Sequence, residues 1–263
     1  MNQQAQVLVR LEERGERGRV AYVTLANEAR ANSLNSLLMD EFAQRLDELA
    51  NDELLRVVVL SGAGERAFCA GANVHELREL TPATGRAFIT RVHLMSKRIR
   101  DLPVPVIARV NGVCLGAGLE VMAACDMRVA ARGALLGMPE VDIGLPSVVE
   151  AALFPQLIGW GRTKQLLYTA QNIDADEALS WGLVEKVVEP TQLDAAVEHW
   201  VAAIVKADPR AIRLQRELIR HWESMPVNDA IAEGIRNFIR ACEGPEPARL
   251  VASVIDRLAR QKS

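Results

Sequence analysis

The sequence predicts an α/β fold of stacked ββα units, followed by a region made almost entirely of helices. Three observations lead to this prediction. Short β-rich runs alternate with helical runs up to about residue 145, two loops of small residues each lead from a strand to a helix, and strands become rare from about residue 147. We expect residues 1–195 to form the core that carries the functional site and residues 196–263 to form the helical region.

The first elements predicted are a hairpin and a helix. Residues 7–13 and 20–25 are rich in apolar and β-branched side chains, and the turn Gly15–Gly18 separates them. Apolar side chains then recur with helical spacing, which predicts a helix over residues 37–49 with Ser36 as its N-cap.

Two strand-to-helix loops consist of small residues. The strand at residues 56–61 leads to Ala70-Gly71-Ala72-Asn73, and the strand at residues 106–110 leads to Gly116-Ala117-Gly118. Small residues leave backbone N–H groups uncovered, and free N–H groups at the start of a helix are available donors. Two such donors aimed at one oxygen would form an oxyanion hole, which stabilises negative charge as it develops.

Several longer helices are expected beyond these loops. Thr81 and Pro82 predict the start of a helix that ends near Asp101, because proline is favoured at the first helical position. The C-terminal helices are predicted at residues 191–206, 208–223, 227–242 and 247–260. Their amphipathic faces require a partner surface, either the core or another subunit.

The composition is that of a globular protein. The 263 residues are 49% hydrophobic and carry a net charge of −3, so no global basic field favours nucleic acid. No apolar run approaches the ~20 residues of a membrane-spanning helix, and no signal peptide is recognisable, which predicts a cytoplasmic protein without a membrane partner. The four cysteines lack metal-ligand spacing, so we expect buried, reduced thiols and no metal site.

Two carboxylates are candidates for chemistry. Glu120 belongs to a helix of otherwise apolar residues, where a carboxylate is costly to bury unless it has a partner or a function. Its alternative role is a first-turn residue stabilised by the helix dipole. Glu140 lies in a loop after Pro139, and its alternative is simple solvation.

Taken together, the order and spacing of these segments resemble the crotonase (enoyl-CoA hydratase/isomerase) superfamily from about Val20 to about Val188. The segments that carry the resemblance are Ala70–Asn73, Val110–Gly112, Gly116–Glu120, Cys125-Asp126 and Pro139–Gly144. The resemblance implies a crotonase-like spiral of ββα units, with Glu120 and Glu140 as catalytic residues and the N–H groups of Ala70 and Ala117 as the oxyanion hole. It also implies that the substrate and its coenzyme A portion contact Ser33, Ala70, Gly71, Ala72, Asn73 and Ala117. The family's usual phosphate-facing lysine is replaced by Ala29 here, so Arg30 is expected either to take its place at coenzyme A or to be an exposed loop arginine.

The function that the resemblance implies is an enoyl-CoA hydratase, which adds water across the double bond of a 2-enoyl-CoA thioester. Coenzyme A would then be part of the substrate, with no separate cofactor, and the C-terminal helices would assemble a homotrimer or homohexamer. Alternatives are an isomerase that moves a 3-enoyl double bond, another acyl-CoA lyase or hydrolase of this fold, and a non-catalytic binding protein. Glu150 departs from the family pattern, which has glycine there; it is expected to be a first-turn helix carboxylate or, alternatively, a third acid facing the acyl chain.

Overall fold

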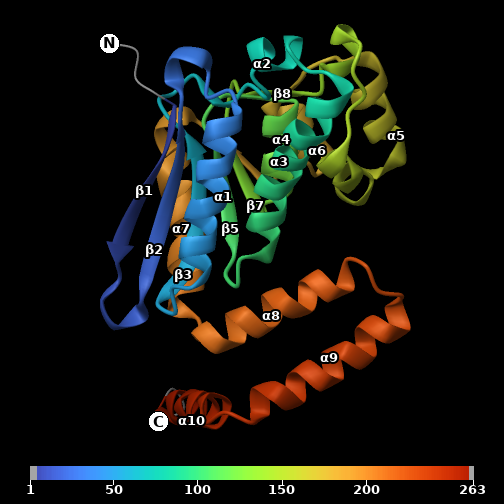
Figure 1. Ribbon diagram of the computed structural model, residues 1–263. Helices are drawn as coiled ribbons and strands as arrows, with labels where there is room; N and C mark the ends of the chain where they lie inside the picture. The colour runs from blue at the N-terminus through green and yellow to red at the C-terminus, as the bar shows by residue number, and fades with distance from the viewer. Residues whose placement is uncertain (1–4, 261–263) are drawn as a thin grey trace. The chain divides into compact units, whose positions relative to one another are not determined.

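The computed structural model describes residues 5–260, and its strands form two sheets (Figure 1). The chain divides into two compact units between Ala203 and Ile204. The boundary expected at residue 195 falls earlier, inside helix α7 (Leu193–Lys206).

The larger sheet has six strands in the order β1-β2-β3-β5-β7-β10. The first two strands pair antiparallel, which confirms the predicted hairpin, and all the other pairs are parallel. The strands are β1 (Gln6–Glu13), β2 (Arg19–Ala26), β3 (Leu55–Gly62), β5 (Val106–Val110), β7 (Met127–Ala131) and β10 (Lys186–Val188).

The smaller sheet has the order β4-β6-β8-β9, and its strands are β4 (Ala67–Cys69), β6 (Val113–Leu115), β8 (Leu135–Gly137) and β9 (Ile173–Asp174). Each of β4, β6 and β8 directly follows a strand of the larger sheet, so successive strand pairs are split between the two sheets. This arrangement confirms the predicted stack of ββα units. Because β4, β6 and β8 are parallel neighbours, the segments that follow them emerge at one edge.

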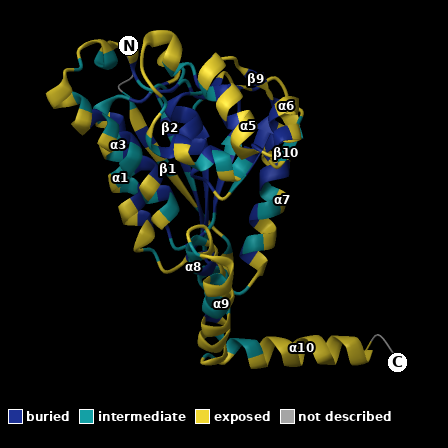
Figure 2. Cartoon of the chain, turned by 90° about the vertical axis from the view of Figure 1, so that its right-hand side faces the viewer, coloured by how far each residue is buried: buried dark blue, intermediate teal, exposed yellow. Residues whose placement is uncertain are grey.

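The helices of the first unit are α1 (Ser36–Ala50), α2 (Val74–Arg78), α3 (Pro82–Asp101), α4 (Ala117–Ala123), α5 (Phe154–Thr169) and α6 (Ala175–Trp181). Two 3₁₀ turns, η3 (Glu140–Ile143) and η4 (Val149–Leu153), precede α5. Figure 2 shows α1 and α3 on one face of the larger sheet and α7 on the other.

The caps of α1 and α3 differ in how well the sequence predicts them. Helix α3 starts at Thr81 and Pro82 as expected, and Thr81 forms a capping box with Thr84. The prediction that Ser36 is the N-cap of α1 is wrong, because the N-cap is Asn35, whose side-chain oxygen accepts the N–H of Leu38 at 2.8 Å. Ser36 instead donates its N–H and its hydroxyl to Glu76, which could not be foreseen from local sequence.

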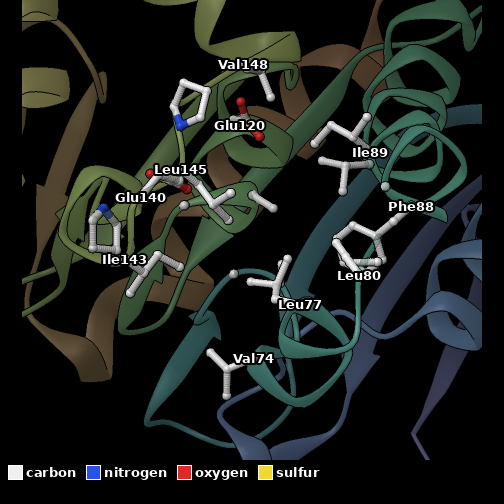
Figure 3. A pocket seen from close by; sticks show the side chains of 18 of the residues that line it. Val74, Leu77, Leu80, Phe88, Ile89, Glu120, Glu140, Ile143, Leu145 and Val148 are labelled. Carbon is white, nitrogen blue, oxygen red and sulfur yellow. The ribbon is translucent and has the colours of Figure 1, made fainter. Parts of the chain in front are cut away.

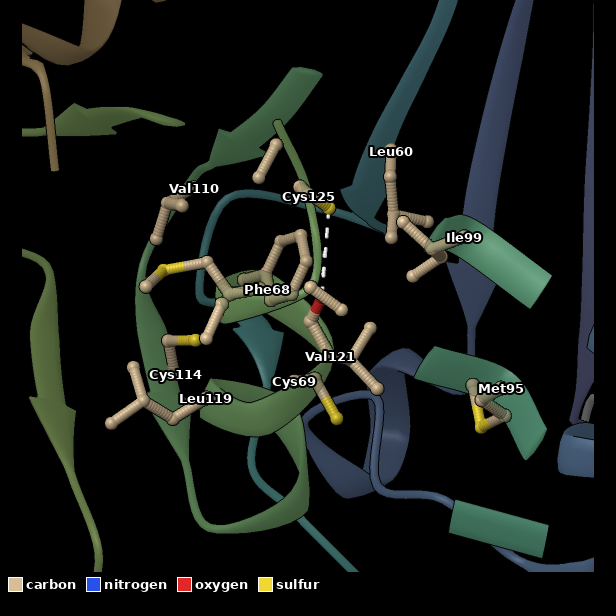
Figure 4. Packing of buried hydrophobic residues seen from close by; sticks show 14 of the residues in the cluster. Leu60, Phe68, Cys69, Met95, Ile99, Val110, Cys114, Leu119, Val121 and Cys125 are labelled. Atoms are coloured by element: carbon tan, nitrogen blue, oxygen red, sulfur yellow. Dashed lines mark hydrogen bonds between the residues drawn. The ribbon is translucent and has the colours of Figure 1, made fainter. Parts of the chain in front are cut away.

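The core joins the two sheets to α3 and α4. Figure 4 shows Phe68 packed among Leu60, Val110, Leu119 and neighbouring residues. The buried cysteines are Cys69, Cys114 and Cys125, as expected, whereas Cys242 is exposed, contrary to expectation. Cys242 is the last residue of helix α9 (Val227–Cys242).

The second unit contains α8 (Pro209–Trp222), α9 (Val227–Cys242) and α10 (Glu246–Arg260). All three helices expose large apolar side chains, namely Ile219 and Trp222 on α8, Val227, Ile231, Ile235, Phe238 and Ile239 on α9, and Leu250, Val251, Val254, Ile255 and Leu258 on α10. Such faces are typical of subunit contacts. Within residues 5–260, no helix combines the length and the apolar character needed to span a membrane.

Candidate active site

A pocket of about 380 Å³ lies where the segments after β4, β6 and β8 meet (Figure 3). Ala70–Ala72 follow β4, Gly116, Ala117 and Glu120 follow β6, and Glu140 follows β8. Figure 3 shows Glu120 and Glu140 on one side of the pocket, across from Leu80 and Phe88. The predicted oxyanion residues and both candidate carboxylates therefore line one pocket.

The N–H group of Ala70 is not available for an oxyanion hole, contrary to the prediction from resemblance. It donates to the carbonyl oxygen of Ala31 at 2.9 Å. No hydrogen bond within residues 5–260 uses the N–H of Ala72, two residues later, or that of Ala117 at the start of α4. Both residues line the pocket. The two free donors are thus Ala72 and Ala117.

Close backbone contacts explain why these loops consist of small residues. Gly71 has φ +92°, and a Cβ atom there would come within 2.9 Å of the Leu115 carbonyl oxygen. A Cβ atom at Gly118 would come within 2.4 Å of the Cys69 carbonyl oxygen. Asn73 caps α2 by accepting the N–H of His75 at 2.9 Å. The glycines therefore let the loops after β4 and β6 approach each other.

A buried asparagine that sequence reasoning passed over supports the first loop. Asn32 is 1% exposed, and its side-chain amide donates to the carbonyl oxygens of Ala63 and Ala67. Its side-chain oxygen accepts the N–H of Asn27. Its backbone has a positive φ of 56°, a conformation that asparagine tolerates better than most residues.

Glu120 is almost completely enclosed. Its side chain belongs to α4, the residue is 3% exposed, and its Oε1 accepts the N–H of Ala151 at 3.1 Å. Burial raises the pKa of Glu120 to about 8, and the nearby charges of Glu140 and Glu150 act in the same direction, while the Ala151 N–H opposes them. The folded structure therefore favours the protonated form of Glu120.

Glu140 is the first residue of η3 and is only partly buried. Its Oε2 accepts the hydroxyl of Ser147 at 3.1 Å. Burial raises the pKa of Glu140, and the Ser147 hydroxyl opposes this shift. The pocket thus combines two carboxylates of raised pKa with two free N–H donors, an arrangement suited to general acid–base chemistry on a carbonyl compound.

The raised pKa of Glu120 predicts a pH-dependent effect on stability. The unfolded chain releases this proton near pH 4.5 but the folded chain only near pH 8, so the protein loses stability as the pH rises through this window. Glu120→Gln removes the titrating group and is expected to remove this loss. The free energy of unfolding of the variant, compared with that of the wild type, is therefore expected to be more favourable at pH 8.5 than at pH 5, by about 1.4 kcal/mol for each unit by which the pKa is raised. Urea unfolding at pH 5 and at pH 8.5 measures the difference in free energy of unfolding between the variant and the wild type. The same difference at the two pH values would contradict the prediction.

The residues predicted to meet coenzyme A lie on the neighbouring surface. Arg30 is exposed and lines a second pocket of about 590 Å³ together with Asn73, His75 and Arg91. Ser33 follows it in the same loop, with its N–H bonded to the Arg30 carbonyl oxygen. Among residues 5–260, no group of histidine, cysteine and acidic side chains could hold a metal ion.

Glu150 occupies a different place from the one expected for a third acid. It lies in the first turn of η4 but is not among the residues lining the pocket, and it contacts His93 on α3.

Comparison with known proteins shows the family to which the chain belongs. The sequence model of the family "Enoyl-CoA hydratase/isomerase" matches residues 15–243. The chain is 39% identical to the short-chain-enoyl-CoA hydratase of Clostridium acetobutylicum over 82% of this chain and 83% of that protein. It is 36% identical to the crotonyl-CoA hydratase of Syntrophomonas wolfei over 70% of this chain and 72% of that one.

Solved structures give the same result for the fold. The crystal structure of an enoyl-CoA hydratase from Bacillus anthracis superposes with a TM-score of 0.89 at 30% identity, covering 95% of this chain and 96% of that chain. An enoyl-CoA hydratase from Mycobacterium smegmatis superposes with a TM-score of 0.90 at 29% identity and the same coverage. The chain belongs to the enoyl-CoA hydratase/isomerase family and has the crotonase fold.

Proposed function

We propose that this enoyl-CoA hydratase uses Glu120 and Glu140 to add water across the 2,3 double bond of a 2-enoyl-CoA thioester. The observation that carries the proposal is the meeting of both carboxylates with the free N–H groups of Ala72 and Ala117 in one pocket. The hydratase relatives support the same reaction.

The thioester oxygen accepts hydrogen bonds from Ala72 and Ala117, which stabilise the enolate as water adds at C3. One carboxylate of the pair takes a proton from the water, and the other gives its proton to C2. The pair ends the cycle with one proton, as it began, so no external acid or base is consumed. This requires that the pair share one proton at working pH, in line with the raised pKa of both groups.

The acyl group is proposed to be apolar. The wall across from the carboxylates is formed by apolar side chains, including Leu77, Leu80, Phe88, Ile89 and Val92. The charged side chains that line the pocket are Glu120, Glu140 and Asp142, all acidic, and no lining residue is basic. A second carboxylate on the acyl group would therefore be repelled without a compensating partner.

Coenzyme A is proposed to extend over Ser33 and Arg30, as part of the substrate, and no separate cofactor is proposed.

The exposed apolar faces of α9 and α10 support a homotrimer or homohexamer, which light scattering would distinguish from a monomer. The cytoplasmic location remains a prediction.

The test is to add crotonyl-CoA to the purified protein and follow loss of the conjugated thioester absorbance. Turnover is expected, together with much poorer use of a 2-enoyl-CoA that bears a terminal carboxylate. No turnover of crotonyl-CoA, combined with conversion of a 3-enoyl-CoA, would overturn the hydratase mechanism in favour of isomerisation.

Gly116 offers a test of how Glu140 is placed. Its backbone has φ +52° and ψ −126°, and a Cβ atom there would lie 2.5 Å from Glu140 Oε1. Gly116→Ala is expected to displace the carboxylate and lower kcat by roughly a hundredfold, the usual effect of a misplaced catalytic group. Steady-state kinetics check it. Gly133→Ala provides a matched control, since Gly133 also has a positive φ of +93°, a Cβ atom there meets nothing within 4 Å, and the residue does not line the active-site pocket; equal losses in both variants would contradict the explanation.

A further inference from the structure

A buried carboxylate that the proposed reaction does not use lies beside the active site. Glu150 is 4% exposed, and its Oε1 lies 2.8 Å from Nδ1 of His93. Its other oxygen, Oε2, is buried and has no hydrogen-bond partner among the described residues. Burying a carboxylate in this way is costly. The surrounding structure must therefore hold Glu150 in place.

The turn that carries Glu150 is strained and is packed between two helices. Val149, the first residue of η4, has φ +39°, a strained conformation that β-branched residues rarely adopt. Both α3 and α4 pack against this turn. The contact between His93 and Glu150 joins α3 to the turn across 57 residues of sequence.

The same turn also donates a hydrogen bond to the carboxylate of Glu120. Ala151, next to Glu150 in the chain, donates its N–H to Glu120 at 3.1 Å. Any movement of η4 would therefore move the one hydrogen-bond donor that the described structure provides for the Glu120 side chain. The contact from His93 to Glu150 is thus one peptide unit away from the contact that orients Glu120.

Charge provides a second connection between the two glutamates. Glu120 is influenced by Glu140 from η3 and by Glu150 from η4, and Asp142 lines the same pocket. Burial raises the pKa of Glu150, while His93 and Arg100, both on α3, act in the opposite direction and favour its ionised form. An ionised Glu150 in turn favours the protonated form of Glu120.

We propose that Glu150 and His93 form a positioning pair for Glu120: the pair holds the strained turn so that the Ala151 N–H meets the Glu120 carboxylate, and it places a negative charge behind the acid–base pair. The role in catalysis rests on the proposed hydration mechanism. The negative charge helps the two catalytic carboxylates to retain their shared proton at higher pH.

The first test is the pH dependence of crotonyl-CoA hydration. Glu150→Gln keeps the size of the side chain but removes its negative charge, which favours the protonated form of Glu120. The alkaline limb of the kcat/KM profile is therefore expected to shift to lower pH by roughly half a pH unit or more. His93→Leu replaces a half-exposed residue, and the limb is expected to move in the same direction because the unpaired Glu150 then takes up a proton. KM is expected to change little in either variant.

Asp47→Asn is the matched control. Asp47 forms an ion pair with Arg98, also on α3, at 2.6 Å, so this variant removes one carboxylate and one contact of that helix away from η4. Its pH profile is expected to match the wild type. If the profiles of Glu150→Gln and His93→Leu also match the wild type, or if both variants mainly raise KM, the proposal is wrong.

A second measurement does not depend on turnover. The effect of Glu120→Gln on the free energy of unfolding is measured against pH, in the wild-type chain and in the Glu150→Gln chain. The pH window assigned to Glu120 is expected to end at a lower pH in the Glu150→Gln background. An unchanged window would overturn the proposal, while a wild type that folds but does not hydrate crotonyl-CoA would overturn only the proposed function.

Discussion

Glu120→Gln and Glu140→Gln are each expected to lower kcat for crotonyl-CoA hydration by roughly 10²–10⁴-fold, the usual contribution of a positioned acid or base. Glutamine preserves the size and much of the hydrogen bonding of each side chain, including the bond from the Ala151 N–H to position 120. KM is therefore expected to stay near the wild-type value. Steady-state kinetics at pH 7.5 would separate the two parameters.

The double variant sharpens this prediction. Because the two carboxylates act on one water molecule, the loss in the double variant is expected to be well below the product of the single losses. Glu198→Gln, which removes a carboxylate paired with Arg14 outside the active site, serves as the control. Retention of wild-type kcat in either single variant would remove that residue from the mechanism.

Ala117→Pro is expected to lower kcat by roughly 10²–10³-fold, because it deletes one oxyanion donor. Backbone donors are usually inaccessible to mutation, but Ala117 is the first residue of α4, where proline is tolerated. Its N–H makes no hydrogen bond within the described residues, so its removal breaks none of the bonds of the helix. Kinetics combined with a thermal unfolding scan would measure both effects.

The matched control is Ala117→Ser, which keeps the N–H and adds a single oxygen atom. It is expected to retain most of the activity, whereas the proline variant loses it with a similar melting temperature. Equal activity in the two variants would show that the Ala117 N–H does not stabilise the enolate.

Much of the site could be predicted from the chain itself. Glycine and alanine at residues 70–72 and 116–118 indicated close backbone approach, and the structure places carbonyl oxygens within 3 Å of the Cβ positions that Gly71 and Gly118 lack. Glu120 was singled out by its apolar helix, and it is buried. These features depend on local spacing and on residue type, which sequence records directly.

The choice between neighbouring groups of the same kind could not be predicted. Ala70 and Ala72 both have a small side chain and an N–H group, and only the passage of Ala31 beside β4 decides that the first is occupied and the second free. Asn35 and Ser36 are both good caps, and Glu76, forty residues away, binds the second.

Sequence by itself therefore determined the family, the α/β architecture and the segments that build the pocket, because periodicity, glycine positions and motif order are local properties. Tertiary structure alone decided which N–H groups remain free, and it alone revealed that Glu150 is buried against His93 behind Glu120. The physical reason is that hydrogen-bond occupancy and desolvation depend on which distant segments pack against a residue.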